Sequence, residues 1–379
     1  MRITRIRCCT VTRRYDGKAS NTRHAWHSKN YVLVELTTQS GLTGLGEMYC
    51  DGGGSPQVAQ TMIEYEIAPH VIGRDPYQRG AIVQSLMDRL ALSARGTAGS
   101  IAISAIDIAL WDLLGRRSGL PCYQLLGGSS NKVSVYASGG MFGVGITPST
   151  LAAEMKAAQS MGLVGAKIKA AAGTLMEDVE RVAAVRDAIG SGIPLMVDAM
   201  FSPTVASAIE LGKAMAPFDL HFLEAPTAMH DVVGWSKVAC ATGLSLAGPE
   251  LSDDRDLMLR MLQADVIDYL QYDVAIAGGL TGGLQLAALA HTYRRKVTLH
   301  CAASAVAMAA AAHLGAGMGP SLCDGLEFHL MHDGLRNLLW AGGWRLSEGQ
   351  LTAPASPGLG ISMGSDELEL LEAGVCCED

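Results

Sequence analysis

The chain has 379 residues, of which 49% are hydrophobic and 17% are charged, and its formal net charge is −8. This length allows one large domain and a second, smaller one. The acidic balance, without a long basic run, argues against nucleic acid or an anionic membrane as a partner. The nine cysteines show no Cys-x-x-Cys spacing, and residues 1–18 lack the apolar stretch of a secretory signal. We therefore expect free thiols in a cytoplasmic protein.

Residues 1–129 are predicted to form an α+β domain. Strand-like runs come first and helical patterns follow, the last of them over residues 98–119. Two loops are expected to interrupt the strands, at residues 13–30 and 50–56. The apolar stretch at 301–319 is mostly Ala and Gly and contains His313. It is interpreted as a helix packed on a sheet, not as a membrane span.

A strand–helix rhythm begins near residue 130, with eight short apolar runs that are each followed by a helical stretch. Seven of the runs end in a polar or charged residue: Lys169, Asp198, Glu224, Glu250, Asp273, His300 and Glu327. Successive members lie 23 to 29 positions apart, enough for one strand, one helix and two loops. The rhythm predicts a closed parallel βα barrel over residues 130–345, with all seven side chains at one mouth. Residues 346–379 lack it and are expected to pack back on the first domain.

Three of the seven positions are carboxylates at consecutive strand ends: Asp198, Glu224 and Glu250. Buried carboxylates repel one another, and a divalent cation removes that cost. Oxygen ligands favour Mg²⁺ first and Mn²⁺ next, and no Cys/His set has zinc spacing. Pairing with basic residues is the alternative, but only two lysines are predicted at the mouth, too few for three acids.

The next two strand ends carry Asp273 and His300. A carboxylate beside an imidazole fixes its tautomer and raises its basicity, so His300 is predicted to be a general base. Lys169 is placed across the mouth from His300, and Lys167 lies on the same strand face as Lys169. Like charge and burial both lower the pKa of an ammonium group, so Lys169 is predicted to act as a second base.

Two further roles follow from this placement. Lys167 is expected to bind a carboxylate oxygen of the substrate, unless both lysines simply lie on an exposed edge strand. Glu327, if protonated, is expected to donate a hydrogen bond to an oxygen that gains negative charge. The alternative for Glu327 is an ion pair at the strand end.

In this order and spacing, the motifs resemble the enolase superfamily, and within it the mandelate racemase-like subgroup. The matching text is KIK (167–169), VDA (197–199), LEAP (223–226), GPE (248–250), the Asp at 273 before VAIAGGLTG, LHC (299–301), LEF (326–328) and SAIDIALWDLLGRRSGLPCYQLLGG (104–128). Each motif alone is weak, but their order is specific and covers nearly the whole chain.

The resemblance implies a (β/α)7β TIM-like barrel, a capping domain formed by the N-terminal region and the C-terminal tail, and one Mg²⁺. It implies removal of the proton α to the carboxylate of a small molecule, through an enediolate, in a homo-oligomer. The metal ligands it implies are Asp198, Glu224 and Glu250, and the catalytic residues are Lys167, Lys169, Asp273, His300 and Glu327. Lys169 and His300 would be bases on opposite faces of the substrate.

Two bases on opposite faces permit more than one outcome. Because the subgroup is rich in acid-sugar dehydratases, dehydration of an aldonate or aldarate is the predicted reaction. Racemisation or epimerisation of a 2-hydroxy acid is the alternative. Cycloisomerisation ranks lower, because family members that perform it usually lack the His/Asp pair.

One departure from the family pattern concerns the third strand. Its motif often ends in Asn, whereas here Met200 follows Ala199, and a thioether cannot replace the hydrogen bond of an amide to the substrate. A non-catalytic family member is therefore a competing hypothesis. A Schiff-base enzyme with Lys169 as nucleophile is another, and the three aligned acids argue against it.

Specificity in such a protein is expected to come from capping-domain loops that close over the barrel mouth. The 13–30 and 50–56 loops fit this position. Four side chains of the first loop are predicted to contact a polar distal end of the substrate: Arg23, His24, Trp26 and His27. The alternative for each is a solvent-exposed loop residue.

Overall fold

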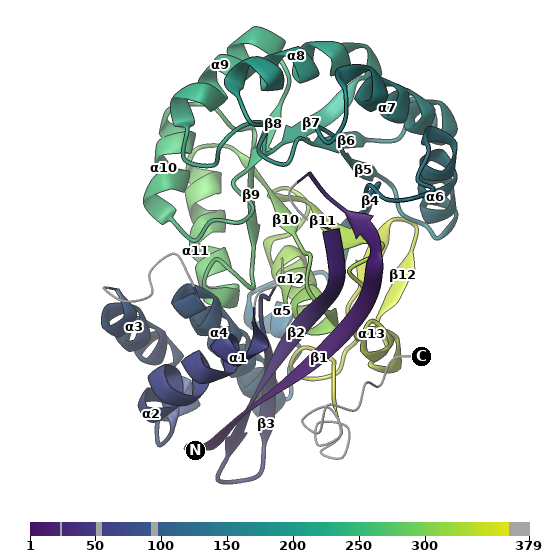
Figure 1. The fold of residues 1–379 in the computed structure, drawn as a ribbon. Helices are drawn as coiled ribbons and strands as arrows, with labels where there is room; N and C mark the ends of the chain where they lie inside the picture. The colour runs from purple at the N-terminus through teal and green to yellow at the C-terminus, as the bar shows by residue number, and fades with distance from the viewer. Residues whose placement is uncertain (23–24, 51–54, 92–97, 364–379) are drawn as a thin grey trace.

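The computed structural model describes residues 1–22, 25–50, 55–91 and 98–363. It has two parts (Figure 1). One is a three-stranded antiparallel sheet with its helices, and the other is a barrel of eight parallel strands surrounded by helices. Residues near the C-terminus join the barrel sheet and then contact the first part.

The capping sheet consists of β1 (Ile3–Ser20), β2 (Ala25–Thr38) and β3 (Thr43–Met48), in the order β1-β2-β3. The prediction of a loop at residues 13–30 was wrong for most of that range. The β1–β2 register runs on through Arg14↔Ser28 and resumes at Ala19↔Trp26. The charged composition of this stretch resembles that of a loop, but in the described part Arg14 and His27 are exposed whereas Trp26 and Lys29 are buried. The result is a long hairpin (Figure 1).

The hairpin extends from the capping domain to the barrel. Near its tip, Ser20 N donates to Phe142 O at 2.7 Å, and Phe142 N donates to Ser20 O at 2.8 Å. Phe142 follows β4, the first strand of the barrel (Lys132–Gly139). The hairpin is thereby held beside the barrel mouth.

Helices follow the sheet in the capping domain. They are α1 (Pro56–Thr61), η1 (Met62–Ile67), α2 (Ala68–Val71), η2 (Pro76–Gln78), α3 (Arg79–Leu90), α4 (Ala98–Ser118) and α5 (Cys122–Leu125). Among them, α1 and α4 contact the sheet directly. Close packing of α4 on β3 requires glycine, because a Cβ at Gly46 would lie 2.0 Å from Ala105 O. By length and composition α4 could cross a membrane, but 78% of its 18-residue apolar window is buried in the fold.

The barrel confirms the prediction of eight parallel strands. After β4 they are β5 (Ala166–Lys169), β6 (Leu195–Asp198), β7 (Leu220–Glu224), β8 (Leu246–Gly248), β9 (Tyr269–Asp273), β10 (Lys296–His300) and β11 (Cys323–His329). Each pairs with the next, and β11 closes the barrel on β4 through pairs such as Glu327↔Tyr136. The runs are short and apolar because helices cover their outer side.

The outer ring consists of one or two helices after each of the strands β4 to β10. They are α6 (Pro148–Ser160), α7 (Leu175–Ile189), α8 (Val205–Met215), η3 (Ala216–Phe218), α9 (Val232–Thr242), α10 (Arg255–Gln263), α11 (Gly279–Thr292) and α12 (Ala305–Met318). The Ala- and Gly-rich stretch expected to be a buried helix is α12. It lies in the hydrophobic core.

The last described segment contains α13 (Asn337–Ala341), β12 (Arg345–Ser347) and β13 (Gln350–Thr352). β13 pairs antiparallel with the start of β4. Further on, Leu359 N donates to Asp112 Oδ1 of α4 at 2.8 Å. Residues 364–379, the rest of the segment expected to return to the capping domain, lie outside the described residues.

Two buried carboxylates of the capping domain bind the first turns of barrel helices. Glu47 of β3 accepts hydrogen bonds from Ser304 N at 2.7 Å and from Ala307 N at 2.9 Å, at the start of α12. Asp107 of α4 accepts from Thr281 N at 2.9 Å in α11. The free N–H groups of a helix N-terminus favour a negative partner. These contacts hold the capping domain at the mouth end of the barrel.

Candidate active site

All seven polar residues predicted at the strand ends are buried at the barrel mouth. The register places Lys169 beside Asp198, Asp198 beside Glu224, and Asp273 beside His300. A cavity of about 440 Å³ lies above them, and five of the seven line it: Lys169, Asp198, Glu224, Glu250 and His300. The other three predicted site residues of the barrel, Lys167, Asp273 and Glu327, are not among the lining residues.

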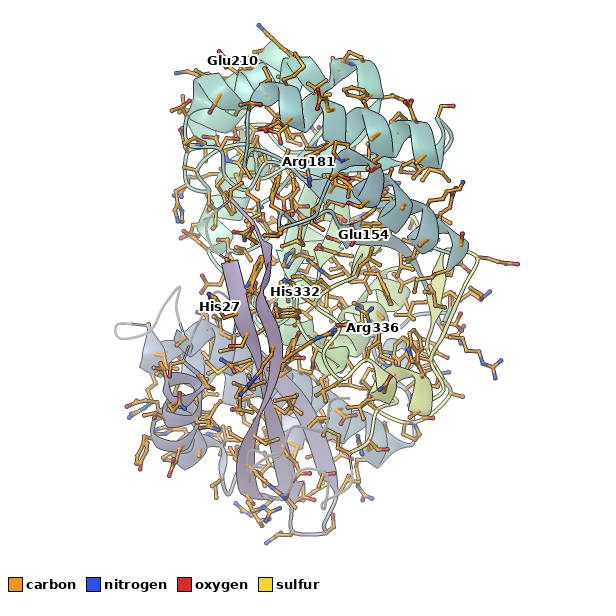
Figure 2. The ribbon with its side chains drawn as sticks, turned by 45° about the vertical axis from the view of Figure 1, so that its right-hand side comes forward. His27, Glu154, Arg181, Glu210, His332 and Arg336 are labelled. Atoms are coloured by element: carbon orange, nitrogen blue, oxygen red, sulfur yellow. The ribbon has the colours of Figure 1, made fainter. Side chains whose placement is uncertain are left out.

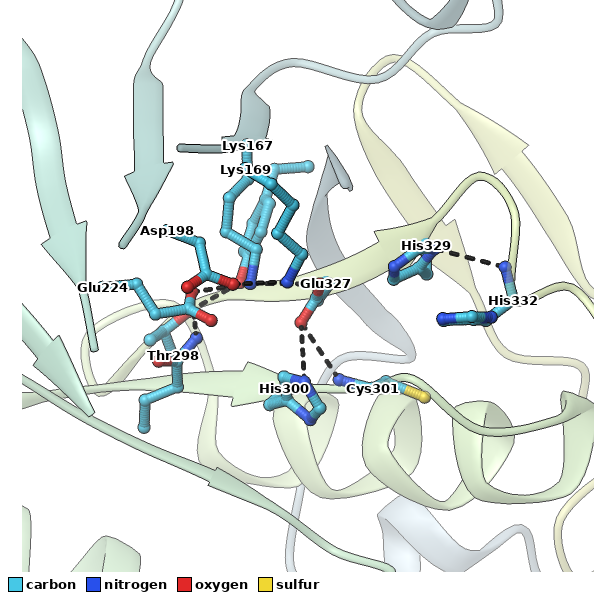
Figure 3. A network of polar contacts seen from close by, with 12 residues as sticks. Lys167, Lys169, Asp198, Glu224, Thr298, His300, Cys301, Glu327, His329 and His332 are labelled. Carbon is cyan, nitrogen blue, oxygen red and sulfur yellow. Dashed lines mark hydrogen bonds and ion pairs between the residues drawn. The ribbon is translucent and has the colours of Figure 1, made fainter. Parts of the chain in front are cut away.

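Two lysines bind two of the three acids (Figure 3). Lys169 Nζ donates to Asp198 Oδ2. Lys167 Nζ lies 2.6 Å from Glu224 Oε2 and 3.0 Å from Glu327 Oε1. Of the described polar atoms, Glu224 Oε1 and Glu250 Oε2 are among those buried without a hydrogen-bond partner. Two lysines therefore leave the three acids short of positive charge.

The pKa values of the three acids reflect this shortage of positive charge. Burial, together with repulsion by Glu224 and Asp198, raises the pKa of Glu250 to about 8. Burial also raises the pKa of Glu224, against the effect of Lys167. For Asp198 burial acts in the same direction, but Lys169 and Lys167 outweigh it and lower the pKa. Glu250 is thus the acid that the protein's own cations stabilise least.

These residues fit a hard divalent cation. Three buried carboxylates, two of them with unpartnered oxygens, are the donor set that Mg²⁺ prefers. Among the residues with described positions, no three Asp, Glu, His or Cys side chains form a ready-made metal site. The ion pairs of Asp198 and Glu224 account for this, because each carboxylate is turned toward a lysine. A cation held by Asp198 would compete with the Lys169 ammonium for the negative charge of that carboxylate.

The lysines depart from prediction in two ways. Burial lowers the pKa of Lys169, but the Asp198 carboxylate opposes it and the net shift is upward, so the expected loss of the proton is wrong for this arrangement. Lys167 is fully buried beneath the cavity, between Glu224 and Glu327. It cannot bind a substrate oxygen directly from there, because its ammonium group faces two carboxylates of the protein.

Glu327 forms the ion pair at the strand end that was the alternative interpretation of this residue. Burial raises the pKa of a carboxyl group, but Lys167 at 3.0 Å and His300 at 3.7 Å hold the pKa of Glu327 well below its usual range. The side chain is an ionised member of an ion-pair network. The expectation that a protonated Glu327 donates a hydrogen bond is therefore wrong here.

His300 and Asp273 form the pair that the sequence predicts. His300 Nδ1 lies 2.8 Å from Asp273 Oδ2, and Asp273 Oδ1 accepts from Ala275 N at 2.8 Å. Burial lowers the pKa of His300, but Glu327 and Asp273 outweigh it and raise the value to about 9. At neutral pH the ring is therefore an imidazolium, with Nδ1–H directed at Asp273 and Nε2–H available as an acid.

Of the four residues predicted to contact the substrate from the capping domain, the structure describes two. Arg23 and His24 lie outside the described residues. Trp26 is buried on β2, lines the cavity, and packs edge-on against His332 with ring centroids 5.1 Å apart. His27 is exposed on the other face of the strand and does not line the cavity (Figure 2). Its alternation with Trp26 explains the difference.

Sequence reasoning missed several polar residues at the site. Gln271 of β9 is fully buried, and its Nε2 donates to Glu224 Oε2 at 2.8 Å. His329 and His332, at and after the end of β11, line the cavity. Gln271 stands two positions before Asp273, and His329 two positions after Glu327. The same-face rule that linked Lys167 to Lys169 would have found both.

One wall of the cavity is apolar. Its members are Met141, Met200, Phe201, Met229 and Leu251. Met200, the departure from the family pattern, has a positive φ of 48° and donates its backbone N–H to Asp198 Oδ1 at 2.7 Å. Its backbone therefore supports Asp198, while its side chain offers a substrate no hydrogen bond.

A closed parallel barrel, a capping domain over its mouth and three buried acids at neighbouring strand ends define a TIM-barrel protein with a candidate cation site. Residues 150–367 match the family model described as enolase C-terminal domain-like. Residues 4–127 match the mandelate racemase/muconate lactonizing enzyme N-terminal domain. The chain belongs to the enolase superfamily, in the mandelate racemase/muconate lactonizing enzyme family.

Similar proteins include two cycloisomerases. The chain is 36% identical over 284 residues to 3,6-anhydro-alpha-L-galactonate cycloisomerase of Streptomyces coelicolor, covering 74% of this chain and 77% of that one. It is 31% identical to D-galactarolactone cycloisomerase of Agrobacterium fabrum, covering 97% and 98%. Dehydratases of arabinonate, gluconate, talarate/galactarate and galactonate also match, at 27–30% identity.

Solved structures agree with this assignment. A racemase from Streptomyces coelicolor with bound magnesium has a TM-score of 0.87 and 30% identity, and the match covers 97% of this chain and 99% of that one. The fold, with its capping domain and barrel, is therefore shared over essentially the whole length.

Proposed function

We propose that this protein is an Mg²⁺-dependent enzyme that removes the proton α to the carboxylate of a sugar acid. The observation that carries the proposal is the arrangement of one cavity. Three buried acids lie at its floor, between Lys169 on β5 and the His300–Asp273 pair on β9 and β10. An amine and an imidazole on opposite sides of a cation site can act on both faces of one carbon of a substrate held there.

The cation would be held by Asp198, Glu224 and Glu250. When bound, Mg²⁺ supplies Lewis-acid stabilisation of the carboxylate oxygens of the substrate. Lys169 is the group placed to accept the α proton at Nζ. The Asp198 carboxylate is the main group that raises the pKa of Lys169. If Asp198 bound another cation, this effect would weaken and burial would lower the pKa of Lys169.

Dehydration is the reaction that the His300 side of the site supports. With a pKa of about 9, His300 holds a proton at neutral pH and can deliver it from Nε2 to a leaving β-oxygen. The Cα–H and Cβ–O bonds break, a carbon–carbon double bond forms, and one water leaves. The resulting enol of a 2-hydroxy acid becomes a 2-keto acid. Asp273 keeps Nδ1–H in place throughout.

Ring-opening isomerisation is a second candidate. The apolar wall of Met141, Met200, Phe201, Met229 and Leu251 suits a ring with few free hydroxyls better than an open polyol. The named cycloisomerases among the relatives support it as well, against its low rank in the sequence-based prediction. The same acid and base would act, but the leaving oxygen would stay attached to the product, whose mass would equal that of the substrate.

The test is a panel of sugar acids and their lactones with Mg²⁺ in D₂O. The panel contains D-galactonate, D-gluconate, D-arabinonate, galactarate and D-galactarolactone. Loss of one water with deuterium at the former β carbon of a 2-keto acid indicates dehydration. Deuterium at that carbon with an opened ring and no loss of water indicates isomerisation. Deuterium with inverted configuration alone would favour epimerisation. Mg²⁺ binding without any exchange would contradict the proposal and favour a non-catalytic family member.

A further inference from the structure

Two histidines outside the acid–base machinery form a pair in the cavity wall. His329 lies on β11 two positions after Glu327, so its side chain points into the barrel one step nearer the mouth. His332 follows in the next loop. Each is 2% exposed, both line the cavity, and their ring centroids are 4.2 Å apart. Figure 3 shows both rings turned toward the side of the site where Glu327 and His300 lie.

Hydrogen bonds determine the tautomer of His329. Its Nδ1 accepts from Met331 N at 3.3 Å and from His332 N at 3.2 Å. An imidazole nitrogen that accepts two backbone N–H groups carries no proton, so the ring proton is on Nε2. Burial and the neighbouring His332 lower the pKa of His329 well below its usual value, which keeps the ring neutral. The cavity-facing atom is therefore an N–H donor.

His332 has the opposite polarity. Tyr15 Oη lies 3.1 Å from Met331 O, and 3.4 Å from both Tyr31 Oη and His332 Nδ1. We assign its proton to Met331 O, the nearest of the three and an atom that can only accept. With that phenol proton engaged, His332 Nδ1–H donates to the Tyr15 oxygen. Burial and nearby positive charge keep His332 neutral by lowering its pKa. Its Nε2 then carries a lone pair, and Trp26 packs against the ring and holds it in place.

The described residues give neither Nε2 atom a hydrogen-bond partner. Neither atom is completely enclosed by protein, so each can be reached from the cavity. The pair thus presents one donor and one acceptor to the cavity. A hydroxyl group both donates and accepts, whereas a carboxylate only accepts and would be repelled by the His332 lone pair. The pair matches a hydroxyl.

We propose that His329 and His332 together bind a hydroxyl group of the sugar acid, at the end remote from the reacting carboxylate, and so select the substrate. The inference rests on the proposed function and adds a specificity site to it. β11 lies across the barrel from β7, which carries Glu224. A substrate whose carboxylate faces Asp198, Glu224 and Glu250 extends its chain toward the pair.

Asparagine variants separate the pair's binding role from its structural role. In His329→Asn the amide oxygen takes the place of Nδ1 and still accepts from Met331 N and His332 N, but the Nε2–H donor is gone. In His332→Asn the amide nitrogen takes the place of Nδ1–H toward Tyr15. His221→Asn is the matched control, because His221 binds Asp324 at 2.7 Å and does not line the cavity. Unchanged thermal unfolding would show that the variants fold.

The measurement is kcat/KM for removal of the α hydrogen with Mg²⁺, followed as deuterium uptake from D₂O into substrate or product. The best acid of the panel is compared with its analogues that lack one distal hydroxyl each. We expect one deoxy analogue to lose about 10- to 100-fold in the unmodified protein and in His221→Asn, as when a buried polar group loses its partner. In His329→Asn and His332→Asn that difference should shrink to about threefold or less, with KM for the parent acid raised.

Each result of this comparison supports or overturns the inference. An equal deoxy penalty in the unmodified protein and in both asparagine variants would overturn the inference while leaving the proposed function intact. A uniform loss for all substrates in the variants would also overturn it, because that indicates a structural role. Absence of exchange with every acid in the unmodified protein would overturn the proposed function and, with it, a sugar hydroxyl as the ligand.

Discussion

The ammonium group of Lys169 is hydrogen-bonded to the carboxylate of Asp198, one strand away in the barrel. Both residues line the same cavity, and the pairing raises the pKa of Lys169 against the effect of burial. The candidate base and a candidate metal ligand therefore compensate each other's charge. A cation that binds Asp198 competes directly with Lys169, so metal binding and the protonation of the base are coupled.

Replacing Lys169 tests this coupling. In Lys169→Met the Asp198 carboxylate loses its competitor, so Mg²⁺ binding measured by calorimetry should tighten. α-Deuterium exchange should fall by about 10²- to 10⁴-fold, the usual contribution of a positioned base. Lys213→Met, on an exposed position of α8, is the control and should change neither. Weaker Mg²⁺ binding in Lys169→Met would contradict the competition.

Mg²⁺ affinity should depend on pH through Glu250. Its pKa of about 8 means that below pH 8 the carboxyl group holds a proton that the metal must displace. The affinity should rise by up to about tenfold per pH unit toward pH 8 and level off above it. Calorimetry at pH 7 in buffers of different ionisation enthalpy should show release of roughly one proton on binding.

Glu250→Gln serves as the comparison for that titration. It removes the titrating group and one anionic ligand, so it should bind Mg²⁺ weakly and without the rise toward pH 8. An affinity that is flat from pH 6 to 9 in the unmodified protein would count against Glu250 as a ligand.

The His300–Asp273 pair should determine the alkaline limb of the pH–rate profile. His300 acts as an acid when protonated, so turnover that needs a leaving oxygen should fall as the pH rises through about 9. In Asp273→Asn the ring loses a carboxylate that raises its pKa, so this limb should move to lower pH and the rate should fall by about 10²- to 10⁴-fold. An unmoved limb in kcat/KM would exclude His300 as its origin.

Packing between β3 and α4 predicts a stability effect away from the site. A Cβ at Gly46 would lie 2.0 Å from Ala105 O, so Gly46→Ala should destabilise the fold by about 1–3 kcal/mol. Gly80→Ala in α3 is the matched control, because its Cβ would meet nothing within 4 Å. It should be neutral or more stable by up to about 1 kcal/mol. Chemical denaturation compares the two, and equal stabilities would refute the packing argument.

The barrel was predictable because its signal is repetitive. Apolar runs at intervals of 23 to 29 residues, each ending in a polar group, leave little choice but parallel strands with their ends at one mouth. The hairpin was not predictable in the same way. Its strands are rich in charged residues, and one of them, Lys29, is buried by a contact with Ala302 of the barrel. Pairing between Ser20 and Phe142, more than a hundred residues apart, fixes the position of its tip.

The amino-acid sequence alone determines which residues lie at the mouth and their order around the barrel, because strand register and alternation are local rules. It also indicates the chemistry open to three acids, an amine and an imidazole. The protonation states do not. Glu327 is ionised, Lys169 keeps its proton and His329 is a neutral donor because of partners from other strands and loops. Only the folded chain brings those charges within a few ångströms in a buried site, where their interactions are strong enough to decide each proton.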